Sequence, residues 1–252
     1  MTPSSLGGHR GARHLDPRER APEPRILVGD LRKTAEAIVA RYPNSRSAAL
    51  PLLFLVQSAE GYVTEQGMRE VADILGLTPA EILATGSFYT MLKKRSQGEY
   101  LVSVCRNISC THLGSRKIVT ELEHHLGIQP GETTADGKIT LETAECLATC
   151  DGAPSIQINY EDFYKVAPET AVELVDRLRR GDEVRSVRGE RVRTAREAAY
   201  ETATVGLRQP GTAGDHVQAT FGGESMLGHD APGFRPKEYG DDVGQPGGPA
   251  DE

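Results

Sequence analysis

Apolar residues recur every three or four positions through the first part of the chain, between residues 28 and 92. This spacing is typical of helices that bury one face. The clearest helix start is Thr78-Pro79, because Glu81 follows at the position that completes a capping box. The pattern therefore predicts a small helical bundle over residues 28–97.

The periodicity changes after residue 98, where β-favouring runs alternate with amphipathic helical segments. The order β-α-β-β-α over residues 98–183 resembles a reduced thioredoxin-like sheet. The strands are predicted at 100–104, 139–143 and 155–158, and the helices at 115–126 and from Pro168 onward, with Gly181 just after the last helix. The predicted fold class is α+β, with an N-terminal helical bundle followed by this second domain.

Neither end of the chain shows such periodicity. Hydrophobic residues make up only 38% of the sequence, below the ~45–50% usual for globular domains, so part of the chain is expected to be unpacked. Residues 1–27 are polar, and residues 206–252 hold 11 Gly and 5 Pro. Such segments bury too little surface to offset the entropy of ordering. We therefore predict a disordered arm at 1–27. The region 184–252 is predicted as a linker or loose helix to about residue 205, followed by a largely disordered tail.

Charge and apolar runs exclude several classes of protein. The 252 residues include 29 basic and 36 acidic side chains, a net charge of −7, which argues against non-specific binding to nucleic acid or anionic membranes. The longest apolar run, 48–56, is interrupted by Pro51 and is far shorter than the ~20 residues of a membrane-spanning helix. Residues 1–25 lack the apolar region of a secretory signal. We expect a reducing, intracellular compartment and no direct membrane insertion.

The four cysteines all lie between residues 105 and 150, as two close pairs separated by 35 residues: Cys105-x4-Cys110 and Cys146-x3-Cys150. Each pair follows a predicted strand, so the two loops can converge on one ligand. In a reducing compartment such a cluster indicates metal or redox chemistry rather than disulfides. Structural zinc tolerates pairs spaced by about two to four residues, and plant-type ferredoxins also contain an x4 gap. The spacing alone therefore leaves zinc and an iron–sulfur cluster both open.

Three motifs around these cysteines resemble the NuoE family, the small 2Fe–2S subunit of the NADH dehydrogenase module of respiratory complex I. They are Cys-Arg-Asn-Ile-Ser-Cys at 105–110, Gly-Glu-Thr-Thr-Ala-Asp-Gly at 131–137, and Glu-Cys-Leu-Ala-Thr-Cys-Asp-Gly-Ala-Pro at 145–154. The resemblance covers about residues 30–182 and includes the helical part. It implies a thioredoxin-like 2Fe–2S ferredoxin domain whose cluster is bound by Cys105, Cys110, Cys146 and Cys150.

The resemblance also implies the working context of the chain. Family members are electron-transfer subunits of NADH:quinone oxidoreductase and exchange single electrons with the FMN of a partner. That partner is a NuoF-type flavoprotein subunit, which binds FMN, NADH and a 4Fe–4S cluster, and a NuoG-type large iron–sulfur subunit lies beside it. Such a complex places the chain peripherally on the cytoplasmic side of the membrane. No catalytic residue is expected in the chain itself, and it lacks a G-x-G-x-x-G after a strand.

Two alternatives stay open from the sequence. One is the equivalent diaphorase subunit of an NAD-linked formate dehydrogenase or hydrogenase. The other is a non-redox interaction module in which the four cysteines bind zinc.

The ligand loops also suggest which groups donate hydrogen bonds to sulfur. Asn107, Ser109, Thr111 and Thr149 are the candidates, because donors near cluster sulfurs adjust the reduction potential. The pair Ala148-Thr149 stands where the family often has Gly-Ala. Away from the cysteines, Phe88 and Tyr89 are expected to be core residues between the bundle and the sheet.

Overall fold

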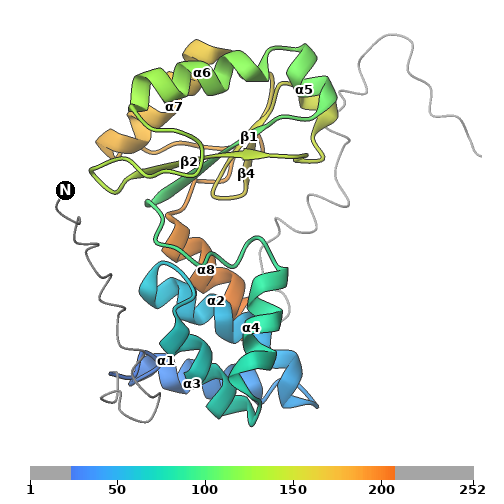
Figure 1. Cartoon of the computed structure of the whole chain (residues 1–252), viewed down its shortest axis with the longest axis vertical. Helices are drawn as coiled ribbons and strands as arrows, with labels where there is room; N and C mark the ends of the chain where they lie inside the picture. Colours follow the sequence, from blue (N-terminus) through green and yellow to red (C-terminus); the bar gives the residue numbers. More distant parts are fainter. Residues whose placement is uncertain (1–23, 208–252) are drawn as a thin grey trace, which may run out of the picture. The chain divides into compact units, whose positions relative to one another are not determined.

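The computed structural model describes residues 24–207 (Figure 1). Most of the predicted arm and tail, residues 1–23 and 208–252, lies outside this range. The last part of the predicted arm does not behave as an arm, because Leu27 is only 2% exposed and belongs to the helical core. The backbone amides of Ile26 and Leu27 donate to the Glu70 carboxylate at 2.7 and 2.9 Å. Packing thus begins before the boundary that the sequence predicted.

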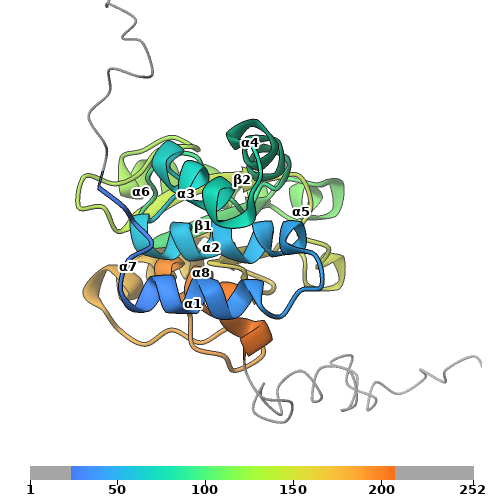
Figure 2. The ribbon, with the colours of Figure 1, turned by 90° about the horizontal axis from the view of Figure 1, so that it is seen from below.

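The helical bundle is built around α2 (Ala49–Glu60). Figure 2 shows it among its neighbours α1 (Asp30–Val39), α3 (Glu65–Leu75) and α4 (Pro79–Phe88). A 3-10 turn, η2 (Ser45–Ala48), leads into α2. The side chains of α2 are apolar almost all round, and Leu52, Leu53, Leu55 and Val56 have no exposed surface. The predicted capping box of α4 is confirmed, since the Thr78 and Glu81 side chains each bond the other's backbone amide.

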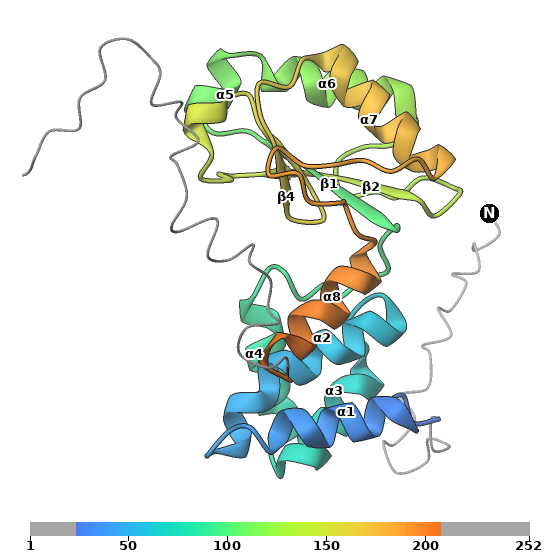
Figure 3. The same cartoon turned by 180° about the vertical axis from the view of Figure 1, so that it is seen from behind.

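The bundle is completed by a helix from the far end of the described chain. Helix α8 (Ala195–Thr204) follows a capping box between Thr194 and Glu197 and packs along α2 (Figure 3). Its buried face carries only small side chains, Ala199 and Ala203, each 3% exposed. The sequence predicted a linker or loose helix over 184–205; a helix is present there, but it is packed against the bundle rather than loose. Alanine gives little amphipathic signal, yet it lets two helices approach closely.

The second part is a four-stranded sheet in the order β2-β1-β3-β4. Its strands are β1 (Tyr100–Cys105), β2 (Ile139–Ala144), β3 (Ile156–Ile158) and β4 (Glu161–Phe163). The pair β1–β2 is parallel, and the other two pairs are antiparallel. The three predicted strands are present. The fourth strand, β4, was not predicted, because its three residues are too few to show a strand pattern.

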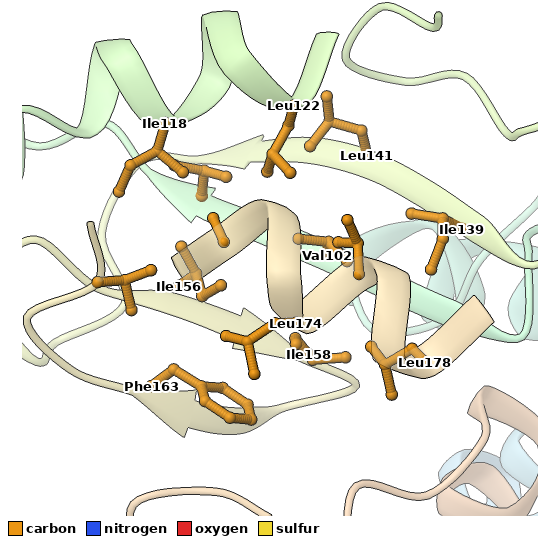
Figure 4. Packing of buried hydrophobic residues seen from close by; sticks show 14 of the residues in the cluster. Val102, Ile118, Leu122, Ile139, Leu141, Ile156, Ile158, Phe163, Leu174 and Leu178 are labelled. Carbon is orange, nitrogen blue, oxygen red and sulfur yellow. The ribbon is translucent and has the colours of Figure 1, made fainter. Parts of the chain in front are cut away.

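Two helices, α6 (Ser115–Leu126) and α7 (Pro168–Arg180), cover the same face of the sheet (Figure 1). Between them and the strands lies an apolar core, which Figure 4 shows from close by. It includes Val102, Ile118, Leu122, Leu141, Ile156, Ile158, Leu174 and Leu178. A short helix, α5 (Ile108–His112), precedes α6 and was not predicted. Among residues 24–207, none of the helices has the length and apolarity to cross a bilayer.

The packing of α8 generates a first prediction. Replacing Ala203→Glu buries a charged side chain between α8 and the bundle, and we expect a loss of about 3 kcal/mol in the free energy of unfolding. Tyr200→Glu is the matched control, since Tyr200 lies on the same helix but is 45% exposed. Urea unfolding followed by circular dichroism measures both variants. Equal stability of the two would contradict a packed α8.

Candidate metal centre

The parallel pairing of β1 with β2 places both cysteine pairs at the same edge of the sheet. Cys105, the last residue of β1, lies opposite Ala144, the last residue of β2. Cys110 follows in α5, while Cys146 comes two residues after β2 and Cys150 starts the 3-10 turn η3 (Cys150–Gly152). Carboxyl ends of adjacent parallel strands are a common position for ligand sites in α/β sheets. The prediction that both pairs follow strands is thus confirmed.

The two pairs differ in exposure. Cys105 and Cys110 are 2% and 1% exposed and form a small apolar cluster with Ala153, against which Leu147 packs. Cys146 and Cys150 are exposed, and all four are free thiols. The first pair is therefore buried, and the second pair lies at the surface in the segment that follows β2.

Four thiols can bind either a single metal ion or a 2Fe–2S cluster, and the placement of the cysteines can be compared with what each group requires. Within residues 24–207, no three His, Cys, Asp or Glu side chains are grouped closely enough to hold a single metal ion. A 2Fe–2S cluster has a different requirement, because each of its two irons needs two thiolates besides the bridging sulfides. Two thiol pairs on the loops after two adjacent strands fit that division. The donor set and its placement therefore suit a two-iron group.

Several contacts join the two cysteine loops. Arg106, next to Cys105, forms an ion pair with Glu145, next to Cys146. The Arg106 amide donates to the Ala144 carbonyl at 2.8 Å, and the Cys105 amide donates to the Ser155 carbonyl at 3.3 Å. The backbone at Cys105 and Arg106 is thus held by hydrogen bonds on both sides, to the end of β2 and to the residue before β3.

The backbone of the second loop includes a strained residue. Ala148 has φ +59°, in the left-handed region, where residues other than glycine cost about 1–2 kcal/mol. In this conformation its amide donates to Sγ of Cys146 at 3.3 Å. Glycine would adopt this conformation without that cost. Here the strain accompanies a hydrogen bond to sulfur.

The four candidate donors have different partners. Asn107 caps α5 by accepting the Ile108 amide at 2.7 Å, and the Thr111 hydroxyl donates to the Arg106 carbonyl at 2.9 Å. Ser109 is half-buried, and its carbonyl accepts the Leu113 amide. Thr149 is 8% exposed, and its hydroxyl donates to that of Ser155 at 2.6 Å.

Ser155 is the residue that sequence reasoning missed. It is 1% exposed, and its Oγ lies 3.6 Å from Sγ of Cys110. In the sequence it stands only as the start of a predicted strand, five residues beyond the last cysteine. Its approach to Cys110 depends on β3 pairing with β1, which no local pattern reveals.

Phe88 and Tyr89 are not buried as predicted. They are 78% and 42% exposed, and their rings meet edge to face with centroids 5.1 Å apart. The prediction that they form core between bundle and sheet is wrong. Helix α4 ends at Phe88, and the chain then turns so that both rings face solvent.

The second cysteine loop depends on close packing at Gly152. A Cβ at this position would lie 2.3 Å from the ring of Tyr164. The Gly152 carbonyl also accepts the Lys165 amide at 2.7 Å. Burial raises the pKa of the Tyr164 hydroxyl above its ordinary value of 10.0. The aromatic ring therefore lies directly against the backbone that follows Cys150.

A second prediction follows from this contact. Gly152→Ala forces the Tyr164 ring away from the loop, and overpacking of this kind costs about 1–3 kcal/mol. The midpoint temperature of thermal unfolding and the iron content per chain should both fall. Gly86→Ala is the control, because a Cβ there meets Leu53 at an ordinary 3.6 Å. The double variant Gly152→Ala with Tyr164→Ala should recover most of the loss. Unchanged stability and iron content in the single variant would contradict the argument.

Comparison with known proteins gives a family match over most of the described chain. The family described as thioredoxin-like [2Fe-2S] ferredoxin matches residues 35–179. All four cysteines lie inside this range. The match also includes most of the helical bundle but stops before α8.

Curated relatives agree with this match. The chain is 49% identical over 163 residues to the E subunit of NADH-quinone oxidoreductase from Mycobacterium tuberculosis, and the aligned part covers 64% of this chain and 65% of that protein. It is 35% identical over 155 residues to "NADH-quinone oxidoreductase subunit 2" of Thermus thermophilus, covering 60% and 86%. The chain thus spans just under two thirds of the mycobacterial relative.

Among solved structures, an NAD+-reducing [NiFe]-hydrogenase chain in the H2-reduced state matches with a TM-score of 0.47 and 25% identity. The match covers 52% of this chain and 22% of that chain. A likeness at this level is too low to bear on function.

Proposed function

Since the chain belongs to the thioredoxin-like [2Fe-2S] ferredoxin family and is similar to the E subunit of NADH-quinone oxidoreductase, we propose that it is an electron-transfer subunit of that complex. Cys105, Cys110, Cys146 and Cys150 bind one 2Fe–2S cluster. The observation that carries the proposal is the placement of two thiol pairs at the adjoining ends of β1 and β2.

The chain's own residues support a role in single-electron transfer. A cluster bound by these cysteines would supply one-electron chemistry, with a total charge of about −2 when oxidised and about −3 when reduced. The buried pair, Cys105 and Cys110, keeps water from one side of the site. The Ala148 amide donates to Sγ of Cys146, whereas the Arg106 cation is paired with the Glu145 carboxylate. The amide dipole favours added negative charge without taking up a proton.

The partners we propose are a NuoF-type flavoprotein subunit and a NuoG-type large iron–sulfur subunit. The flavoprotein binds FMN, NADH and a 4Fe–4S cluster, and its FMN exchanges electrons with the cluster of this chain. The names of the curated relatives, which are subunits of NADH-quinone oxidoreductase, support a place in a complex of several subunits. So do large apolar side chains left in solvent, since Phe88, Ile108 and Leu113 are 78%, 69% and 61% exposed. The chain is then a peripheral subunit on the cytoplasmic side of the membrane, and oxidoreductase activity belongs to the whole complex.

The cluster is tested by electron paramagnetic resonance of the purified chain reduced with dithionite, with iron and zinc assayed on the same sample. We expect an S = 1/2 signal and about two irons per chain. Cys146→Ser should lower the iron content and alter or abolish the signal. A silent spectrum with about one zinc per chain, after anaerobic reconstitution, would instead identify a structural zinc module.

The complex is tested by affinity purification of the tagged chain from its own cells. We expect the flavoprotein and large iron–sulfur subunits of NADH:quinone oxidoreductase to copurify, together with NADH oxidation that depends on added quinone. Copurification with subunits of a formate dehydrogenase or a hydrogenase would contradict this assignment. In that case the cluster proposal would stand, and only the complex would change.

A further inference from the structure

Two buried hydroxyls connect the second cysteine loop to the first cysteine pair. Thr149 lies between Cys146 and Cys150, and its Oγ1 is 2.6 Å from Oγ of Ser155. Ser155 Oγ in turn lies 3.6 Å from Sγ of Cys110. Thr149 is 8% exposed, and both Ser155 and Cys110 are 1% exposed. The three side chains thus form a continuous contact that is shielded from solvent.

The chemistry of a bound thiolate fixes the direction of these hydrogen bonds. Each hydroxyl has one proton to donate, whereas a cysteine sulfur that binds iron has lost its proton and only accepts. Ser155 must therefore donate to Sγ of Cys110. Its own oxygen is then free to accept, and the Thr149 hydroxyl donates to it. Each bond polarises the next one, so Thr149 strengthens the bond that Ser155 makes to sulfur.

We propose that Thr149 and Ser155 form a hydroxyl relay that ends on Sγ of Cys110 and raises the reduction potential of the cluster. Ser155 touches the ligand sulfur, and Thr149 is a positioning residue that acts through Ser155. The relay rests on the proposed cluster. Reduction adds one electron to the cluster and exchanges no proton or bond with the chain. A hydrogen bond to sulfur is stronger when the sulfur carries more negative charge, so it stabilises the reduced form.

Ser155 is held in place by backbone contacts with β1. Its carbonyl accepts the Cys105 amide at 3.3 Å, so it is bound through its backbone to one cysteine and through its side chain to another. The next residue, Ile156, pairs with Val104 of β1 and is fully buried. The donor therefore approaches the sulfur at a position set by strand pairing.

The experiment is a redox titration of the full chain, followed by electron paramagnetic resonance. At the wild-type midpoint, Ser155→Ala should lower the ratio of reduced to oxidised cluster about tenfold, which is about 59 mV for a one-electron couple. Thr149→Val should lower this ratio several-fold, and Thr149→Ser, which keeps the hydroxyl, should leave it near the wild-type value. The double variant Ser155→Ala with Thr149→Val should shift no further than Ser155→Ala alone.

Thr133→Val is the matched control. Its hydroxyl bonds that of Thr140 at 2.8 Å, so it also belongs to a pair of hydroxyls in the sheet domain. Thr140 lies near the start of β2, whereas the cysteine loops follow the strand's other end. The variant should leave the midpoint potential unchanged. A shift equal to that of Thr149→Val would show a general effect of losing a hydroxyl pair and would overturn the relay.

The outcomes separate the relay from the proposed function. A wild-type chain without a two-iron signal overturns both. A wild-type chain that holds the cluster, with a midpoint that Ser155→Ala leaves unchanged, overturns the relay alone. An additional shift from Thr149→Val in the Ser155→Ala background also overturns it, because Thr149 would then act independently. If Ser155→Ala fails to retain iron, Thr149→Val decides: a lowered midpoint supports the relay, and an unchanged one overturns it.

Discussion

The parallel pairing of β1 with β2 is the constraint on which the site depends. In this register Cys105 ends β1 directly opposite the end of β2 at Ala144, so the loops that carry the two cysteine pairs begin side by side. A shift of one residue would turn every side chain of the strand to the other face of the sheet. The backbone hydrogen bonds of the sheet therefore bring the two loops that carry the thiol pairs to the same edge.

The apolar core explains why this register is fixed. Val102 of β1 and Leu141 of β2 are fully buried beneath α6 and α7 (Figure 4). A slipped strand would expose these side chains to water, at a cost of about 1.5–3 kcal/mol for each one. The core therefore sets the position of a site that lies at its edge. This position is also where the backbone departs from regular structure, with Ala148 in the left-handed region and Gly152 pressed against Tyr164.

The helical bundle shows a different use of packing. Its central helix, α2, is covered on one side by α8, which comes from the other end of the described chain. The chain passes from the bundle into the sheet domain and then returns, so the two parts are not successive in sequence. The return segment also contributes Val184 and Val192 to the core of the sheet. Residues after 183 thus hold both cores together, although their composition resembles that of a linker.

The sequence by itself determined the helices with strong amphipathic patterns, the capping box at Thr78, the three predicted strands and the four cysteines with their spacing. These features depend on neighbours within about one or two turns, which a linear pattern records. Only the tertiary structure decided that α8 packs against α2, that Phe88 lies in solvent and that Ser155 approaches Cys110. These depend on contacts between residues far apart in the chain. Small or polar residues such as Ala203 and Ser155 make such contacts without a periodic apolar signal, because their burial follows from close packing rather than from their own hydrophobicity.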